Sequence, residues 1–160
     1  MVLFMSTKGQ VISYDFIFAF GVFILVILII LIYLDQSTKN IKETKNIDEI
    51  IYLSNQISEV WMREGYPNSW EPGDVVELGL MSDSRLNITK IVYLEEIGYQ
   101  KVSTMLGLGD YNFYMEILDS DKNSIFTFGL TPNNPDFASK TRRISILDSK
   151  VVFLDTVVWK

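Results

Sequence analysis

The sequence predicts an α+β protein, in which a long N-terminal helix precedes a small head domain with an antiparallel β-sheet and short helices. Three observations predict this class. A continuous apolar run covers residues 16–34. Apolar residues spaced three and four apart follow over residues 47–61, as in an amphipathic helix. Beyond residue 66, turn residues separate short segments, and the last of these alternate apolar and polar residues as antiparallel strands do.

The apolar run contains nineteen residues, from Phe16 to Leu34, and no charged side chain. As a helix it is about 28 Å long, close to the roughly 30 Å hydrocarbon core of a bilayer. Apolar side chains occupy every face of this helix, which is typical of a membrane span and rare in a soluble core helix. Tyr14 and Tyr33 flank the run, where aromatic rings favour the membrane interface. We therefore expect a transmembrane and assembly helix over residues 10–34.

The N-terminus does not have the order of an ordinary secretory signal. Such a signal places its small-residue cleavage site after the apolar core. Here Lys8 and Gly9 precede the apolar run, and the polar stretch DQSTKN follows it. A cut beside Gly9 would therefore leave the apolar helix on the mature chain.

The segment KGQVISYDF (residues 8–16), followed by the long apolar run, resembles the class III signal of archaeal type IV pilin-like proteins. In that family a prepilin-type peptidase cuts after the glycine, and an acidic residue follows shortly inside the mature chain. The resemblance implies a leader peptide over residues 1–9 and cleavage between Gly9 and Gln10.

Asp15 is the acidic residue that the resemblance assigns to assembly. The family usually has glutamate four residues after the first mature residue, whereas Asp15 lies five after Gln10 and four after Val11. Cleavage after Gln10 therefore stays open. The resemblance implies that Asp15 pairs with the new terminal amine, on the same or a neighbouring subunit, and sets the axial register between subunits. A carboxylate between packed helices needs such a partner. Alternatively, it marks the membrane boundary and reaches water.

The charges around the apolar run conflict with the topology that the resemblance implies. That topology places residues 35–160 outside the cell. The positive-inside rule counts Lys8 and the terminal amine against Lys39, Lys42 and Lys45, and this count favours the opposite orientation. We give the leader motif more weight and expect an extracellular C-terminal domain.

A second helical segment follows the polar stretch. Its apolar residues occupy about half of the helical wheel: Ile47, Ile50, Ile51, Leu53, Ile57, Val60 and Trp61. Gly65 and Pro67 end it. No proline or glycine lies between residues 34 and 64, so residues 35–65 are predicted to continue the stem helix. A break at residues 35–40 is the alternative.

Residues 66–160 are predicted to form the head domain. Trp70 and Trp159 are expected in its core. GYPNSW after the long helix and the terminal VVW are similar to head domains of archaeal pilin-like proteins. The spacing predicts a strand at 75–81, helices at 89–97 and 99–106, a hairpin within 111–130, and a hairpin of strands 143–147 and 151–159.

Composition argues against most catalytic chemistry. The chain has no cysteine and no histidine, which removes the usual zinc sites, thiol nucleophiles and Ser–His–Asp triads. Its net charge of −6 argues against a nucleic-acid partner. No pair of carboxylates has a spacing that indicates a catalytic cleft. We predict no enzymatic activity, no catalytic residue and no cofactor.

One segment resembles half of a calcium-binding loop. Asp119, Asp121 and Asn123 have the spacing of its first ligands. Ser124 stands where that loop requires glycine, and Leu130 stands where it requires glutamate. We therefore expect a polar hairpin turn here and no metal site.

Asn87 begins the chain's N-glycosylation acceptor triplet, Asn87-Ile88-Thr89. The same asparagine is suited to capping the helix predicted at 89–97. Both roles stay open at this point.

Taken together, these features predict a pilin-like structural subunit of an archaeal type IV pilus-like surface filament. Its expected partners are the prepilin-type peptidase, other pilin-like subunits (self or related) and the membrane, and its function would include adhesion. Ala19 and Gly21 are the small residues of the apolar run and would allow close helix approach. The alternative is a non-polymerising single-pass membrane protein that presents an extracellular binding domain.

Overall fold

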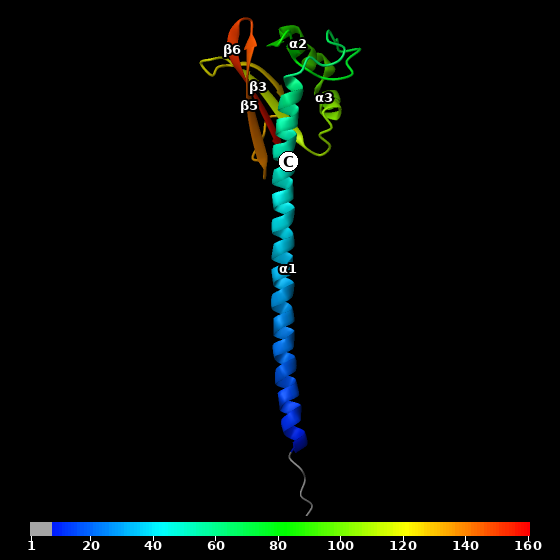
Figure 1. The fold of residues 1–160 in the computed structure, drawn as a ribbon, viewed down its shortest axis with the longest axis vertical. Coiled ribbons are helices and arrows are strands. Elements are labelled where there is room, and N and C mark those ends of the chain that lie inside the picture. Colours follow the sequence, from blue (N-terminus) through cyan, green and yellow to red (C-terminus); the bar gives the residue numbers. More distant parts are fainter. Residues whose placement is uncertain (1–7) are drawn as a thin grey trace, which may run out of the picture. The chain divides into compact units, whose positions relative to one another are not determined.

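The structure, a computed structural model, describes residues 8–160, with side chains for residues 14–39, 41 and 44–160. A long N-terminal helix precedes a small domain with antiparallel sheets and short helices, which confirms the predicted α+β class (Figure 1). The elements are α1 (Lys8–Trp61), β1 (Met81–Ser82), β2 (Arg85–Leu86), α2 (Ile88–Ile97), α3 (Tyr99–Met105), β3 (Asn112–Leu118), β4 (Ser124–Gly129), β5 (Ala138–Leu147) and β6 (Lys150–Trp159).

The chain divides into two compact units, residues 1–44 and residues 45–160. α1 runs through residues 35–40 without a break, so the alternative of two separate helices is not observed. Its last turns, from residue 45, belong to the second unit. α1 ends at Trp61, a few residues before the predicted stop at Gly65.

The buried face of the last turns of α1 differs from the predicted one. Ile50, Ile57 and Trp61 are buried as expected, but Ile47 and Ile51 are exposed. Two serines, Ser54 and Ser58, belong to the buried face instead.

Ser54 and Ser58 are completely buried one turn apart on α1. The Ser54 hydroxyl lies 2.9 Å from the hydroxyl oxygens of both Ser139 and Thr141 on β5. Arg143 Nε donates to Ser58 Oγ at 3.0 Å. Short hydroxyl side chains thus join helix to strand, and a search for apolar periodicity does not detect such a contact.

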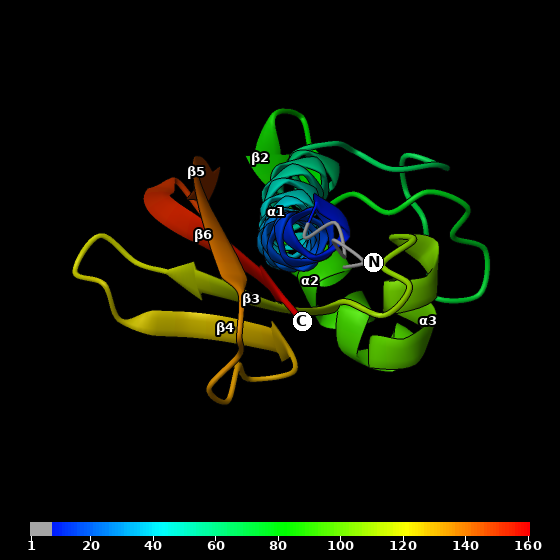
Figure 2. The ribbon, with the colours of Figure 1, turned by 90° about the horizontal axis from the view of Figure 1, so that it is seen from below.

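The main sheet has four antiparallel strands in the order β4-β3-β6-β5. Figure 2 shows it on one side of the last turns of α1, with α3 on the other side. Apolar side chains from alternate positions of β3 and β6 fill the space between them: Phe113, Met115, Ile117, Val152, Leu154 and Val158. Trp70 and Trp159 are buried, as predicted.

Both hairpins and both short helices of the head domain are confirmed. Gly98 separates α2 from α3 with a φ of 82°, a conformation that side chains with a Cβ rarely adopt. β5 begins at Ala138, five residues before the predicted start at 143. In its early part the hydroxyl side chains of Ser139 and Thr141 face the serines of α1, and the charged side chains of Lys140 and Arg142 face away. Because both faces are polar, this part has no alternation of apolar and polar residues, and its sequence pattern does not predict a strand.

The predicted strand at 75–81 is wrong. Only an isolated bridge between Tyr66 and Glu77 forms there, and β1 begins at Met81. The segment instead folds back over the end of α1. A Cβ on Gly79 would collide with the backbone of residues 63–65, and Trp70 Nε1 donates to the Gly79 carbonyl at 2.9 Å.

A buried lysine holds this region together. The side chain of Lys90 is 3% exposed, and its Nζ donates to the carbonyl oxygens of Glu64 and Met81 at 2.7 and 2.8 Å. Burial lowers the pKa of Lys90, and the carboxylate of Glu64 partly opposes this. The ammonium thus joins the chain after α1 to β1 and α2.

A buried carboxylate organises the opposite face of the sheet. Asp155 on β6 is 1% exposed. Arg142 binds it through two hydrogen bonds of 2.6 and 2.7 Å, and Lys140 Nζ lies 2.6 Å from it. Burial alone would raise the pKa of Asp155, but the bonds from Arg142 and Lys140 outweigh burial and lower it.

We expect Asp155→Asn to lower the free energy of unfolding by about 2–3 kcal/mol at pH 7, because it leaves two cations without their buried partner. The wild-type carboxylate has a lower pKa folded than unfolded. Its contribution is therefore present above about pH 4 and is lost as the pH falls through the lowered value.

Urea unfolding of the full chain in detergent, followed by tryptophan fluorescence at pH 7 and pH 3, measures this effect. Asp148→Asn in the exposed turn before β6 is the matched control. Equal stability of the Asp155→Asn variant and this control at pH 7 would contradict the assignment.

Candidate functional site

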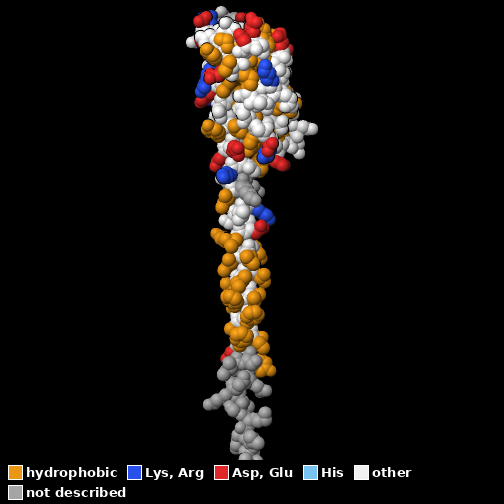
Figure 3. All heavy atoms as spheres, turned by 90° about the vertical axis from the view of Figure 1, so that its right-hand side faces the viewer, with side chains coloured by type: hydrophobic (Ala, Val, Ile, Leu, Met, Phe, Trp, Pro, Cys, Tyr) orange, Lys and Arg blue, Asp and Glu red, His pale blue; other side chains and the backbone are white. Residues whose placement is uncertain are grey.

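The most unusual surface of the molecule is the apolar part of α1. Between Tyr14 and Leu34 every large apolar side chain except the half-buried Ile27 is exposed. Figure 3 shows hydrophobic side chains covering this part of the helix. No residue in the most apolar stretch of α1 is buried by the rest of the chain. Among the described residues α1 is the one helix long and apolar enough to cross a membrane. A soluble surface rarely carries so large an apolar area, so this segment requires a cover from outside.

Charged residues lie only at the two ends of this segment. Asp15 is exposed and immediately precedes the apolar run. Beside it, the rings of Phe16 and Phe20 stack with their centroids 6.3 Å apart. At the other end Asp35 and Lys39 form an exposed ion pair of 2.8 Å across one helical turn. Asp15 is thus the one ionisable group, apart from the tyrosine hydroxyls, between Tyr14 and Leu34.

The two small residues of the run cannot lie in one helix–helix contact. Ala19 and Gly21 are two positions apart, which separates them by about 200° around a helix. A Cβ added to Gly21 would meet no atom of the chain within 4 Å. Glycine inside a helix costs about 0.5–1 kcal/mol relative to alanine. No contact within the described residues requires that cost, so Gly21 is available for the close approach of another helix.

The predicted cleavage site lies at the limit of what the structure describes. Residues 1–7 of the predicted leader lie outside the described part, and Gly9 and Gln10 are described only as backbone of α1. Cleavage at Gly9 or Gln10 therefore stays a prediction.

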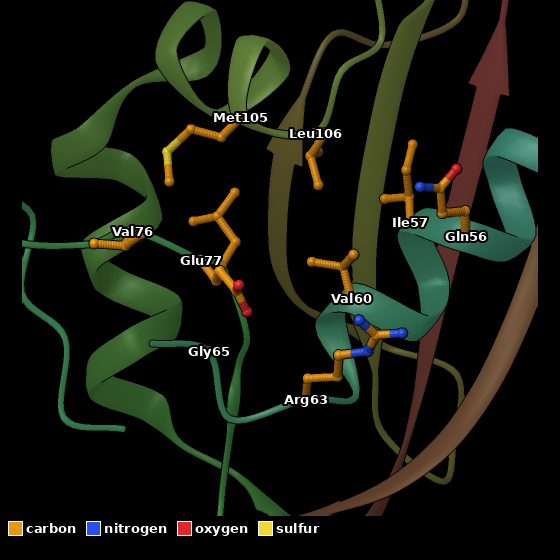
Figure 4. A pocket seen from close by; sticks show the side chains of 10 residues that line it. Gln56, Ile57, Val60, Arg63, Gly65, Val76, Glu77, Met105 and Leu106 are labelled. Atoms are coloured by element: carbon orange, nitrogen blue, oxygen red, sulfur yellow. The ribbon is translucent and has the colours of Figure 1, made fainter. Parts of the chain in front are cut away.

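The second unit contains a pocket of about 230 Å³ beside the end of α1 (Figure 4). Arg63 and Glu77 are its two charged residues, and both are exposed. Among the described residues no three metal-binding side chains cluster, here or elsewhere. The other residues that line the pocket are Gln56, Ile57, Val60, Gly65, Val76, Leu78, Met105 and Leu106.

The segment that resembles half of a calcium loop forms the turn between β3 and β4, as predicted. One carboxylate oxygen of Asp119 accepts hydrogen bonds from the backbone N–H groups of Asp121 and Asn123, at 2.9 and 2.8 Å. The other oxygen accepts from the Asn123 side chain at 3.0 Å. These bonds lower the pKa of Asp119, the side-chain bond from Asn123 most. Asp119 therefore stabilises its own turn.

Asn87 caps α2. Its side-chain oxygen accepts from the backbone N–H groups of Thr89 and Lys90 at 2.9 and 3.4 Å. Its side-chain nitrogen donates to Ser82 Oγ at 3.1 Å. Both ends of the amide thus have a structural role, and glycosylation at Asn87 stays a prediction.

We expect Asn87→Ala to destabilise the chain by about 1 kcal/mol, because two N–H groups at the start of α2 lose their acceptor. Asn87→Asp keeps that acceptor and is expected to lose less. Chemical unfolding of both variants measures the difference. Equal losses would show that the bond to Ser82, and not the cap, is the important contact.

Within residues 8–160, these features define one helix of membrane-spanning length and character and a separately packed α+β unit. No protein-family model, curated protein or solved structure matches the chain.

Proposed function

We propose that the protein is a pilin-like structural subunit, held in the membrane by residues 10–34 and assembled into a surface filament after a prepilin-type peptidase removes its leader. Residues 35–160 lie outside the cell in this proposal, and residues 45–160 form the compact unit presented there. One observation carries this proposal: an unbroken apolar helix surface, exposed on all sides, has a single carboxylate at its start.

The apolar helix accounts for both the anchored and the assembled state. Burying one large apolar side chain is worth about 1.5–3 kcal/mol, so the seventeen large apolar or aromatic side chains of residues 16–34 strongly favour a water-free environment. Lipid supplies that environment to a single chain, and the helices of identical neighbours supply it in a filament. Because the surface is apolar on every side, a helix of this kind can be surrounded completely.

Asp15 behaves differently in these two environments. In a single helix at the membrane edge its carboxylate reaches water. Between packed helices it is desolvated and needs a positive partner. The amine created by leader cleavage lies only a few residues away in sequence and is that partner in our proposal. Pairing of the two charges would fix the axial position of each subunit.

The second unit supports a role as a presented head domain. It has its own core, which includes the last turns of α1. The two charged residues that line the pocket at the end of α1, Arg63 and Glu77, are both exposed. Catalytic sites typically hold ionisable groups that are shielded from water, and this pair is not shielded. We therefore propose a structural and not a catalytic role.

Expression with and without a prepilin-type peptidase tests the processing step. We expect the mass of the mature chain to correspond to a start at Gln10 or Val11 only when the peptidase is present. A native chain that keeps residues 1–9 would instead favour a non-polymerising, single-pass membrane protein with an extracellular binding domain.

We expect Asp15→Ala to leave processing intact but to reduce incorporation into sheared filaments by about tenfold or more, as the loss of a buried charge pair would. Asp15→Glu keeps the charge and is the matched control, for which we expect near-normal incorporation. Quantitative blotting of sheared and membrane fractions gives both numbers. Normal filaments from Asp15→Ala would remove the register role of this residue.

A further inference from the structure

β5 presents a basic and apolar surface on the side of the sheet that faces away from α1. β5 is an edge strand that pairs only with β6. Ser139, Thr141 and Arg143 point toward α1, so the alternate residues point away from it. Ile144 is 64% exposed among them. We call this the β5 surface: Lys140, Arg142, Ile144 and Ile146.

The exposed charges of the β5 surface itself are positive, because the side chains of Lys140 and Arg142 are 51% and 42% exposed. The strand contains three cations and no carboxylate. Two carboxylates face the same side of the sheet: Asp155 on β6 and its cross-strand neighbour Glu116 on β3. Asp155 is 1% exposed and holds both cations in place, and Glu116 attracts Arg142. The two cations therefore form the exposed edge of this face, and the carboxylates lie further from the edge. Arg142 also lies over the ring of Phe153, with its guanidinium carbon 5.3 Å from the ring centroid. The β5 surface is therefore a preformed site for a partner that is both acidic and apolar.

The loop before β1 presents a surface of that kind. Tyr66 and Val76 are 61% and 65% exposed. Residues 65–78 contain no cation, and the exposed carboxylates beside the two apolar residues belong to Glu71, Asp74 and Glu77. Two exposed cations border this segment, Arg63 beside Glu77 and Lys101 at the Pro72 carbonyl, so its carboxylates outnumber the cations three to two. We call this the loop surface: Tyr66, Glu71, Asp74, Val76 and Glu77.

The loop surface is also rigidly built. The Tyr66 carbonyl accepts from the backbone N–H groups of Val76 and Glu77 at 2.9 and 3.1 Å, and Tyr66 N donates to the Glu77 carbonyl at 2.9 Å. Lys101 Nζ reaches the Pro72 carbonyl at 3.3 Å. Val76 and Glu77 border the pocket in Figure 4, which gives this surface an apolar hollow.

The two surfaces lie on opposite sides of the last turns of α1. In Figures 1 and 2, β5 and β6 lie on one side, and the green loop before β1 lies on the side of α3. Both belong to the second unit, so each copy of the chain carries them in the same arrangement. Two copies standing side by side and parallel can therefore bring one surface against the other.

We propose that the β5 surface of one copy binds the loop surface of a second copy. The proposal rests on the proposed function, in which helices in one membrane or filament hold the copies parallel. The contact is heterologous, so each copy keeps one free surface of each kind and further copies can add. Pairing two β5 surfaces instead would oppose Lys140 and Arg142 with their like-charged equivalents, which disfavours a closed dimer.

The absence of cysteine from the chain makes this contact easy to test. The double variant V76C/I144C in the full-length protein, reconstituted in lipid vesicles and treated with a short bismaleimide, is expected to give a ladder of covalent oligomers. V76C alone and I144C alone are expected to give little product, and a mixture of the two is expected to give a dimer. The matched control is V76C/L130C. Leu130 is 46% exposed, but it directly follows β4, the edge strand on the opposite side of the sheet from β5.

The electrostatic part of the contact has its own test. Adding E77K to the V76C/I144C variant, or raising salt from about 50 mM to 1 M, is expected to lower the oligomer yield roughly fivefold. Circular dichroism of the E77K variant checks that the chain still folds.

No ladder, a ladder equal to that of V76C/L130C, or a dimer from I144C alone would each overturn the proposed contact. A yield that does not respond to E77K or to salt would overturn its charge complementarity. The result is separable from the proposed function. Filaments without this crosslink would leave the pilin-like role standing, whereas crosslinks in a chain that is never processed would leave only the contact.

Discussion

The structure depends on one constraint: the apolar surface of residues 16–34 has no cover within the described part of the chain. The run has no charge, it is apolar on all sides, and its flanking charges are exposed at its two ends. Water is an unfavourable environment for such a surface, and in our proposal lipid or other helices replace it. In our proposal the carboxylate of Asp15 at its start is the group whose free energy differs most between those two environments.

In the second unit, the last turns of α1 pack tightly against the sheet. The core of this unit includes the last turns of α1, so the helix and the sheet cannot separate without exposing Trp61 and Phe113, whose rings pack 6.1 Å apart. Serines on α1 and hydroxyls on β5 bring the two elements into close contact. The buried ammonium of Lys90 donates hydrogen bonds to the chain after α1 and to β1. The buried carboxylate of Asp155 accepts two hydrogen bonds from Arg142 on the face of the sheet that points away from α1. The last turns of α1 are therefore an integral part of the second unit.

The general layout could be predicted because it depends on simple patterns. The fold class was predicted from an uncharged run long enough to span a membrane, from apolar residues at helical spacing, and from two hairpins in which apolar and polar residues alternate. The structure confirms this class. The errors arose where tertiary contacts replaced those patterns. The start of β5 was missed because its inward face meets Ser54 and not an apolar side chain, and the strand at 75–81 was wrong because Gly79 packs against the chain leaving α1. Asn87 could be predicted as a cap, whereas nothing in its spacing indicated that Lys90 would be buried beside it.

The central claim is that residues 16–34 are covered by lipid or by other subunits in the native state. Single cysteines at positions 20, 25 and 30 of the otherwise cysteine-free chain, labelled in intact cells or membranes with a charged, membrane-impermeant maleimide, test it most directly. A cysteine in place of the exposed Tyr52 is the reference. We expect all three positions to react at least about tenfold more slowly than position 52 and to become reactive in detergent with denaturant. Reaction as fast as the reference in untreated membranes would contradict the account.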